Sequence, residues 1–377
     1  MLAVIGGLGV GGTERQLLSV YAGLDRQRFE PAIFVLKQGA ALEDEARSAG
    51  IDVLHADRVP NGVLGLWHSA LALRRTLRTW RPAIVHFMLP EAYLVGAPVC
   101  LLSSSARRVM SRRSLRLYQR RYPGAALVER CLHRAMHAVV ANSRAVAGEL
   151  VEEGVAATQL ALIYNGVAAS ALPPRAVARA RLGLPEDAFV LVVVANLIPY
   201  KGHADLIHAL TRARLPRSWH LLCCGRDDGV GADLAAQAQA CGVAEKITWC
   251  GLVDDPRPML AAADLAVLPS HQEGFSNALL EAMAAGLAVI ATDVGGNGEA
   301  LGGVAGRLVP PCDPASLARA IAELAADAGA RARLGRAGLA RVAEHFAQDA
   351  CVARYERLYD WLTSGAGQPV PVELRPR

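Results

Sequence analysis

Aromatic residues are scarce in this chain of 377 residues, where Phe, Trp and Tyr together make up 5%. A surface that stacks nucleic-acid bases depends on such side chains, so a base-stacking function is disfavoured. Long apolar runs are also missing: the longest, Phe189–Ile198 and Leu94–Leu102, fall short of the ~18 residues that a membrane-spanning helix needs. The hydrophobic fraction of 53% in turn excludes a disordered or collagen-like chain.

Cysteines with the spacing of a metal or redox motif are absent as well. The eight cysteines are scattered and none forms a C-x-x-C pair, so no zinc or redox motif is predicted. Most lie in apolar runs, which is typical of reduced core thiols and predicts a reducing cytoplasm. The first twelve residues lack a basic segment and a small-residue cleavage site, so they are interpreted as a strand and a glycine turn rather than a signal peptide.

Acidic residues are unevenly distributed. Residues 1–170 carry 20 basic against 13 acidic side chains, whereas residues 171–377 carry 20 against 22. The excess is greatest in Arg107–Arg134, where nine arginines face one acid, Glu129. A solvated helical face in an arginine-rich protein explains this pattern, but the missing acids favour a patch for an anionic acceptor or an anionic membrane surface.

Short apolar runs alternate with helical patterns along the chain, which predicts βαβ units and parallel sheets. The alternation stops near Pro173-Pro174 and then restarts, so the fold class is predicted as α/β with two doubly wound, Rossmann-like domains facing a central cleft. The predicted parts are an acceptor-binding domain, a nucleotide-sugar-binding domain, a helix packing back on the first domain, and a disordered Pro-rich tail: residues 1–170, 171–345, 346–364 and 365–377.

The loop Gly7–Gly12 follows the first strand and matches G-x-G-x-x-G, a dinucleotide-binding pattern. A nicotinamide site also needs an acid at the end of the second strand, and that strand ends at Lys37-Gln38, which disfavours an oxidoreductase. Gly11 and Gly12 still allow the backbone to approach an anion or a sugar. A plain tight turn explains the glycines equally well.

A capped helix is predicted after Ser276, which is a good N-cap, with Gly286 as its C-terminal stop. The N–H groups of Asn277, Ala278 and Leu279 in its first turn would favour an anion, and a diphosphate fits.

Two acids flank the start of this helix, with seven residues between them. Glu281 lies about one turn into the helix, where its carboxylate can accept hydrogen bonds from ribose hydroxyls. Glu273 precedes the helix and can meet a transferred group. Two ordinary surface carboxylates would give the same pattern.

The stretch Asp264–Glu299 resembles the nucleotide-sugar-binding signature of the retaining glycosyltransferase family 4, also called glycosyl transferases group 1, which has the GT-B fold. The resemblance is densest there and covers nearly the whole chain. Shorter matches support it elsewhere: Gly11-Gly12-Thr13-Glu14, Ala141-Asn142-Ser143-Arg144, Tyr164-Asn165-Gly166-Val167, Lys201-Gly202, and Gly251 with Asp254-Asp255.

The resemblance implies roles for individual residues. Glu273 would contact the donor sugar as a catalytic residue, Glu281 the donor ribose, and Lys201 the donor diphosphate, whose charge grows as the glycosidic bond breaks. The implied donor-binding set is Asn196, Lys201, Gly225, Ser276, Asn277, Ala278 and Glu281. The family needs no divalent metal, and the acid pairs Asp227-Asp228 and Asp254-Asp255 are interpreted as turn residues.

The chain departs from the family pattern in two places. Asn196 stands where relatives often carry an arginine on the diphosphate, and we expect Arg226 or an arginine of the first domain to compensate. Relatives often have two histidines after the fourth strand; here His86 is present and Met88 fills the second place. His86 is assigned to the catalytic set, although an ordinary core histidine would look the same. Arg112 and Arg113 are assigned to the acceptor side, with the glycine loop at Gly11 and Gly12.

The resemblance implies a metal-independent hexosyltransferase of the EC 2.4 class without a cofactor. It would move sugar from a nucleotide-diphosphate sugar to a glycan or lipid-linked acceptor in bacterial cell-surface polysaccharide synthesis, with retention. No nucleic-acid partner is expected. The expected location is cytoplasmic, with peripheral contact to the plasma membrane through Arg107–Arg134. Two alternatives stay open: a nucleotide-sugar epimerase of the same fold, and an inactive nucleotide-sugar-binding module.

Overall fold

The computed structural model describes residues 1–37, 41–56, 63–364 and 369–376, and the side chains of Val63, Arg120, Arg121 and Val372 lie outside this description. The chain forms two compact units, one made of Met1–Gly166 with Gln348–Arg377 and the other of Val167–Ala347. The divisions fall at Gly166 and Ala347, against expected boundaries at 170 and 345. Within the described ranges, no helix is both long and apolar enough to cross a membrane.

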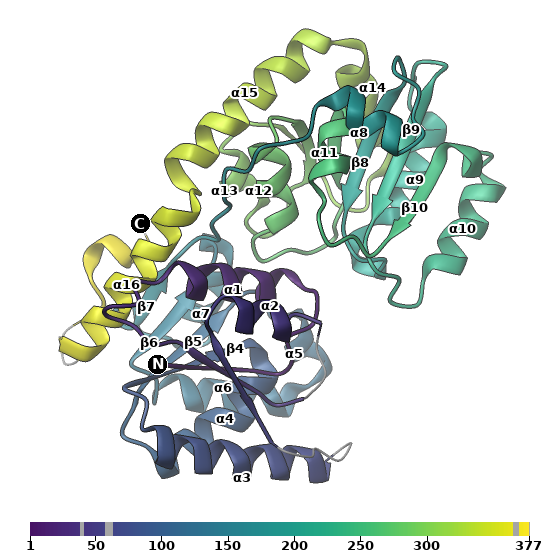
Figure 1. Ribbon diagram of the computed structural model, residues 1–377. Coiled ribbons are helices and arrows are strands. Elements are labelled where there is room, and N and C mark those ends of the chain that lie inside the picture. The colour runs from purple at the N-terminus through teal and green to yellow at the C-terminus, as the bar shows by residue number, and fades with distance from the viewer. Residues whose placement is uncertain (38–40, 57–62, 365–368, 377) are drawn as a thin grey trace. The chain divides into compact units, whose positions relative to one another are not determined.

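The first unit is built on a parallel sheet of seven strands in the order β3-β2-β1-β4-β5-β6-β7 (Figure 1). Its central strands are buried along their whole length, as expected when helices cover both faces of a parallel sheet. The strands are β1 Leu2–Ile5, β2 Ala32–Val35, β3 Asp52–His55, β4 Ile84–Met88, β5 Arg107–Arg112, β6 Ala138–Ala141 and β7 Leu160–Leu162.

Two helical layers cover this sheet. Side chains that alternate along β1 enter two different cores: Ala3 and Ile5 pack with α1, α2 and α16, whereas Leu2 and Val4 pack with α3, α4, α6 and α7. The helices are α1 Gly12–Gly23, α2 Glu43–Ser48, α3 Val63–Trp80, α4 Leu89–Ser103, α5 Leu117–Arg121, α6 Pro123–His133, α7 Arg144–Glu152, α16 Gln348–Ser364 and the 3₁₀ turn η3 Val372–Leu374.

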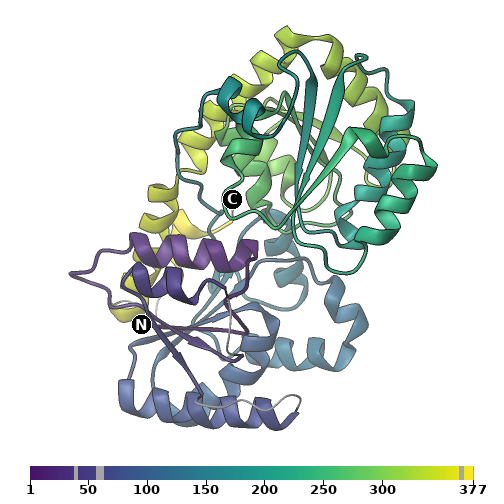
Figure 2. The ribbon, with the colours of Figure 1, turned by 45° about the vertical axis from the view of Figure 1, so that its right-hand side comes forward.

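The end of the chain belongs to the first unit. Helix α16 lies beside α1 in both views (Figures 1 and 2), and its Tyr355 and Tyr359 are buried in the core. The expected disordered tail is corrected for residues 369–376, because Val370 and Leu374 are 0% exposed and the Val370 N–H donates to the Thr158 carbonyl at 2.8 Å. The Pro-rich segment forms only the short 3₁₀ turn η3, and its composition does not prevent packing. Residues 365–368 and 377 lie outside the described residues.

The second unit repeats the pattern with six parallel strands in the order β10-β9-β8-β11-β12-β13. The strands are β8 Phe189–Val194, β9 Trp219–Cys224, β10 Ile247–Gly251, β11 Leu265–Leu268, β12 Ala288–Thr292 and β13 Arg307–Val309. The helices are α8 Arg175–Arg181, η1 Pro199–Lys201, α9 His203–Arg212, α10 Gly231–Ala240, η2 Ala244–Lys246, α11 Arg257–Ala262, α12 Asn277–Ala284, α13 Asn297–Leu301, α14 Pro314–Ala326 and α15 Ala328–His345.

In both sheets the first strand of the unit lies in the middle, and the strand order reverses beside it. The reversal falls between β1 and β4 in the first unit and between β8 and β11 in the second. In open α/β sheets, ligands bind outside the carboxyl ends of the strands at such a reversal. The loops that follow β8 and β11 are therefore the place to look for a site in the second unit.

Candidate functional site

The loops after β8 and β11 touch through their backbones. Gly202 ends the turn η1 with a φ of 72°, and a Cβ on it would lie 1.9 Å from the Pro269 carbonyl oxygen. Only glycine tolerates both the left-handed backbone and this approach. Gly202 is thus required here, because it allows the loop after β8 to place Lys201 against the loop after β11.

Lys201 and Glu273 meet across these loops. The Lys201 Nζ donates to the Glu273 Oε1 at 2.7 Å, and the Ser270 hydroxyl donates to the same oxygen at 2.8 Å. The Lys201 side chain is 19% exposed and that of Glu273 10%, so an incoming ligand can reach both. A cation and a carboxylate are therefore held together at the strand-order reversal.

Helix α12 begins next to this pair. The Ser276 Oγ accepts the Leu279 N–H at 3.3 Å, which is the cap expected from the sequence. This bond corrects the expectation that the Leu279 N–H is available to an anion. Asn277 and Ala278 stand partly exposed in the first turn. Glu281 lies in the second turn and is also partly exposed. The residues expected to bind diphosphate and ribose thus share one helix end, whose dipole favours negative charge.

The loop that carries Glu273 toward the helix is fixed by its neighbours. A Cβ on Gly295 would lie 1.8 Å from the Glu273 carbonyl oxygen, and the Gly296 N–H donates to the Gly274 carbonyl at 2.9 Å. The buried Thr292 hydroxyl donates to the Ser270 carbonyl. The segment Ser270–Ser276 is consequently a rigid support for Glu273 rather than a free loop.

Asn196 and Gly225 lie at the carboxyl ends of β8 and β9. The Asn196 Oδ1 accepts the Arg226 N–H at 3.1 Å, and a Cβ on Gly225 would lie 2.0 Å from the Ala195 carbonyl oxygen. The Arg226 guanidinium binds Asp228 at 2.6 Å, so this arginine is already engaged with an acid instead of standing ready to replace the missing charge at Asn196.

The adjacent acid pairs lie in turns. The Asp227 Oδ1 accepts the N–H groups of Gly229, Val230 and Gly231 at 2.9–3.0 Å, and these hydrogen bonds lower the pKa of its carboxyl group. Asp255 accepts the Arg257 N–H at 3.0 Å. The carboxylates of Asp227 and Asp255 thus bind local backbone N–H groups.

His203, for which the sequence predicts no role, is buried directly after Gly202. Neither ring nitrogen has a hydrogen-bond partner among the residues that the structure describes, and burial together with the Lys201 charge lowers its pKa to about 4. An unpaired buried imidazole beside Lys201 is costly unless something binds it. Its position immediately after Lys201-Gly202 is the signal that would have found it.

His86 is in the core, which corrects its assignment to the catalytic set. Its Nδ1 lies 2.9 Å from the Tyr359 hydroxyl and its Nε2 2.7 Å from the Ser111 hydroxyl, and the residue is 1% exposed. Burial, with a contribution from the Arg113 charge, lowers its pKa to about 3. Both ring nitrogens are engaged, so His86 fastens α16 and β5 to β4.

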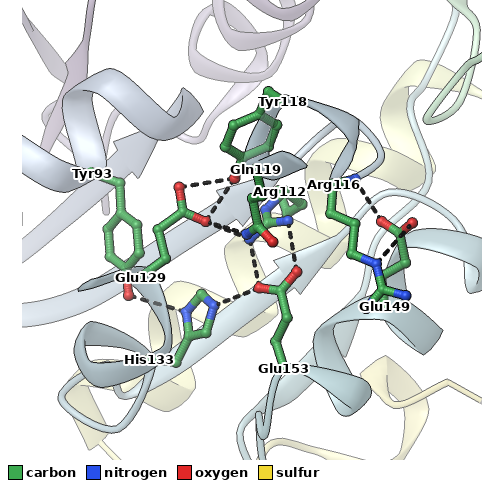
Figure 3. A network of polar contacts seen from close by, with 9 residues as sticks. All are labelled: Tyr93, Arg112, Arg116, Tyr118, Gln119, Glu129, His133, Glu149 and Glu153. Atoms are coloured by element: carbon green, nitrogen blue, oxygen red, sulfur yellow. Dashed lines mark hydrogen bonds and ion pairs between the residues drawn. The ribbon is translucent and has the colours of Figure 1, made fainter. Parts of the chain in front are cut away.

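Arg112 is buried too, which corrects its assignment to the acceptor side. Its guanidinium binds Glu129 at 2.8 Å and Glu153 at 2.9 Å, and all three side chains are at most 1% exposed. Figure 3 shows these groups pointing toward one another from β5, α6 and the end of α7. The network also contains Tyr93, Tyr118, Gln119 and His133.

The remaining arginines of Arg107–Arg134 divide between paired and exposed ones. Arg116 binds Glu152 at 2.6 Å, and Arg113 donates to the Asn165 Oδ1 at 2.6 Å. Arg130 and Arg134 are exposed, whereas the side chains of Arg120 and Arg121 lie outside the description. The acids that the segment lacks are supplied by residues 149–153, so its sequence charge overstates the charge on its surface.

The glycine loop after β1 places Gly11 at the N-cap of α1. A Cβ on Gly11 would lie 2.4 Å from the Glu14 Oε2, and Gly12 is exposed as the first residue of the helix. The loop thus ends at a helix N-terminus, as expected, within the first unit.

Both units match models of known families. Residues 10–171 match glycosyltransferase family 4, and residues 188–327 match glycosyl transferases group 1. The chain is 36% identical over 254 residues to a D-inositol 3-phosphate glycosyltransferase of Thermobispora bispora, covering 62% of this chain. The chain spans about half the length of the first such relatives it matches, 58%, 54% and 48%.

A glycogen synthase of Mycobacterium tuberculosis is similar over more of its length: 30% identity over 311 residues, 78% of this chain and 73% of the relative. The solved structure of Anabaena HepE in complex with UDP and glucose superposes with a TM-score of 0.86 at 22% identity, covering 95% of this chain and 98% of HepE. The fold is therefore GT-B, and the chain belongs to glycosyltransferase family 4, the glycosyl transferases group 1.

Proposed function

We propose that this protein is a glycosyltransferase of the EC 2.4 class that moves a hexosyl group from a nucleotide-diphosphate sugar to an acceptor. The observation that carries the proposal is the Lys201–Glu273 pair, 2.7 Å apart at the strand-order reversal and adjacent to the capped end of α12. That arrangement supplies a cation, helix N–H groups and a carboxylate around one point.

The chemistry follows from where charge develops. As the glycosidic bond breaks, negative charge grows on the leaving diphosphate, and Lys201 with the N–H groups of Asn277 and Ala278 stabilises it. Lys201 then turns from Glu273 to the phosphate, which releases the Glu273 carboxylate to hold the sugar. Glu281 binds the ribose hydroxyls.

The reaction proceeds with retention, without a covalent sugar–enzyme intermediate, and with the leaving phosphate as the base. In this course Glu273 is not a nucleophile, which agrees with its Oε1 being already held by the Lys201 Nζ and the Ser270 hydroxyl. The step needs no divalent metal, because Lys201 and α12 take its place at the diphosphate. UDP-glucose is the first donor to test, since solved relatives of the same fold were captured with UDP and UDP-glucose.

The acceptor is a glycan or a lipid-linked sugar used in bacterial cell-surface polysaccharide synthesis, handled in the cytoplasm. An anionic membrane surface would be contacted through α3 rather than through Arg107–Arg134. Exposed Leu64, Trp67 and Leu71 share a helix face with the exposed Arg74, Arg75 and Arg78. Cosedimentation with anionic vesicles that is lost in Trp67→Ala supports this contact, and cosedimentation unchanged in Trp67→Ala removes it.

The test is nucleotide release by the full chain from UDP-, GDP- and ADP-sugars, with and without an acceptor extract. Acceptor-dependent release, unchanged by added Mg²⁺ or Mn²⁺, supports transfer, and NMR of the product's anomeric proton tests retention. An isomerised nucleotide sugar without release would instead indicate an epimerase. Donor binding without turnover would indicate an inactive binding module.

A further inference from the structure

A second cluster of chemically reactive side chains lies in the second unit, next to the loops that carry Lys201 and Glu273. Asp205, His271 and Cys312 each offer one possible ligand atom, and these atoms lie within 4.8 Å of one another. The His271 Nε2 and the Asp205 Oδ2 are 2.8 Å apart. We propose that Asp205, His271 and Cys312 form a zinc-binding site.

Three separate elements bring these ligands together. Asp205 lies in the first turn of α9, His271 follows β11, and Cys312 precedes α14, which packs on α9. The His271 N–H donates to the Tyr200 carbonyl at 2.7 Å, which fixes the backbone that carries the imidazole. A metal bound here would join three segments that are distant in sequence.

Cys312 is presented by a stiff loop. Pro310, Pro311 and Pro314 surround it, and the Asp313 Oδ1 accepts the N–H groups of Ala315 and Ser316 at 3.1 and 2.9 Å. Cys312 itself has a φ of 57°, a left-handed backbone conformation that residues other than glycine rarely adopt. An exposed cysteine thus occupies a position whose backbone suits glycine, and its thiol faces a histidine and a carboxylate.

The donor set selects the metal. A thiolate, an imidazole and a carboxylate are the three ligand types of zinc sites, and three protein ligands leave a fourth position for water. Thiolate and carboxylate together neutralise Zn²⁺. Zinc–ligand bonds of about 2.0–2.3 Å place tetrahedral ligands roughly 3.3–3.6 Å apart, so the Asp205–His271 hydrogen bond has only to open slightly.

A second group of the same kind in the described residues shows what excludes a metal. Glu129, His133 and Glu153 also converge, but they are buried and the Arg112 guanidinium already binds both carboxylates. A second cation would face that charge without solvent. At Asp205, by contrast, the side chain is 23% exposed and that of His271 34%, so an ion can enter.

The chain provides a matched control in Cys241, whose Sγ lies 4.0 Å from the His208 Nδ1. This pair resembles Cys312 and His271 but belongs to neither of the two metal-ligand groups found among the described residues. A loosely bound zinc ion on any cysteine–histidine pair would therefore be affected equally by Cys241→Ser and Cys312→Ser.

In the experiment, the full chain is treated with EDTA, and the EDTA is then removed by buffer exchange. The protein is titrated with ZnCl₂ in competition with a chromophoric chelator, and MgCl₂ is the negative control. We expect one equivalent of zinc to bind the wild type and Cys241→Ser alike. Cys312→Ser and His271→Ala should weaken this binding at least about tenfold. With CoCl₂, a thiolate-to-cobalt charge-transfer band should appear and vanish only in Cys312→Ser.

The proposal would be overturned if the wild type bound no equivalent of zinc tightly in competition with the chelator. Equal zinc affinity in the wild type and Cys312→Ser would also overturn it. Since Cys312 is exposed, Cys312→Ser should fold even if His271→Ala does not, and circular dichroism checks this. The readout does not use transfer activity, so it stands or fails independently of the proposed function.

Discussion

Glu273 and Glu281 differ in their surroundings, and this predicts different kinetic defects. Glu273 is held by Lys201 and Ser270 where the sugar is proposed to lie, whereas Glu281 lies in the second turn of α12, where the donor ribose is proposed to bind. We expect Glu273→Gln to lower kcat about 100-fold with little change in nucleotide affinity. Glu281→Ala should mainly weaken nucleotide binding, measured by calorimetry.

Glu245→Ala, at an exposed acid of the same unit, is the control and should change neither kcat nor the nucleotide affinity. Wild-type kinetics in both Glu273→Gln and Glu281→Ala would contradict the site assignment.

His86 predicts a pH dependence of stability instead of a catalytic role. Burial holds its pKa at about 3, below the usual value near 6.5. In this pH range His86 is protonated in the unfolded chain but not in the native chain, so the free energy of unfolding falls as pH drops from about 6.5 toward 3. One such group contributes at most about 1.4 kcal/mol per pH unit.

The matched variant is His86→Gln, which keeps hydrogen bonds to Tyr359 and Ser111 but does not titrate. Urea unfolding between about pH 6.5 and 4.5 should show a shallower loss, reduced rather than abolished because His137 and His203 also have lowered pKa values. Activity should persist. An unchanged slope with lost turnover would restore His86 to the catalytic set.

Arg112 predicts a stability defect of another size. Removing its charge in Arg112→Met leaves Glu129 and Glu153 buried without a cation, which should lower the free energy of unfolding by about 3–5 kcal/mol. Arg116→Met is the matched control, since Arg116 is 36% exposed, and it should cost about 1 kcal/mol or less. Urea unfolding of both variants measures the difference, and equal losses would contradict the role of the network.

At the level of secondary-structure elements, the junction between the β8 and β11 loops depends on Gly202. In Gly202→Ala the new methyl group would meet the Pro269 carbonyl and push Lys201 away from Glu273. We expect donor affinity to fall about tenfold or more, together with a loss of stability. The change in affinity is measured by nucleotide titration.

Gly242 is the matched position, with a φ of 68° and no neighbouring atom within 4 Å of the place that a Cβ would take. Gly242→Ala should therefore show the backbone strain alone, about 1 kcal/mol, with normal donor affinity. Equal donor affinity in the two variants would show that the loop contact does not matter.

Elements from the far end of the chain complete the first unit. Helix α16 buries Tyr355, Leu358, Tyr359 and Leu362 against it. A chain ending at residue 347 should therefore lose the cooperative unfolding of the first unit while the second unit still folds. Limited proteolysis of this chain and of one ending at residue 364 measures the protease resistance of each unit. A protease-resistant first unit in the chain ending at residue 347 would contradict the account.

For the molecule as a whole, the sequence predicts the parts whose signals are local. The alternation of apolar runs and helical patterns indicates two α/β units, and Ser276 and Gly286 mark the ends of a helix that the structure contains. Lys201-Gly202 and Glu273 are likewise found together. These predictions rest on neighbours in sequence, which caps, turns and periodicity report.

What the sequence does not predict depends on distant partners. Glu129 and Glu153, the acids that bind Arg112, come from α6 and the end of α7. Tyr359, whose hydroxyl binds His86, comes from α16. Val370 and Leu374 are buried although their segment looks like a disordered tail. In each case the fold, not the local pattern, decides what is exposed.

A crystal structure of the full chain with a bound nucleoside diphosphate would test the proposed diphosphate site itself. The account predicts phosphate oxygens within hydrogen-bond distance of the Lys201 Nζ and of the N–H groups in the first turn of α12, with Lys201 turned from Glu273. A diphosphate bound elsewhere, with the Lys201–Glu273 pair intact, would contradict it.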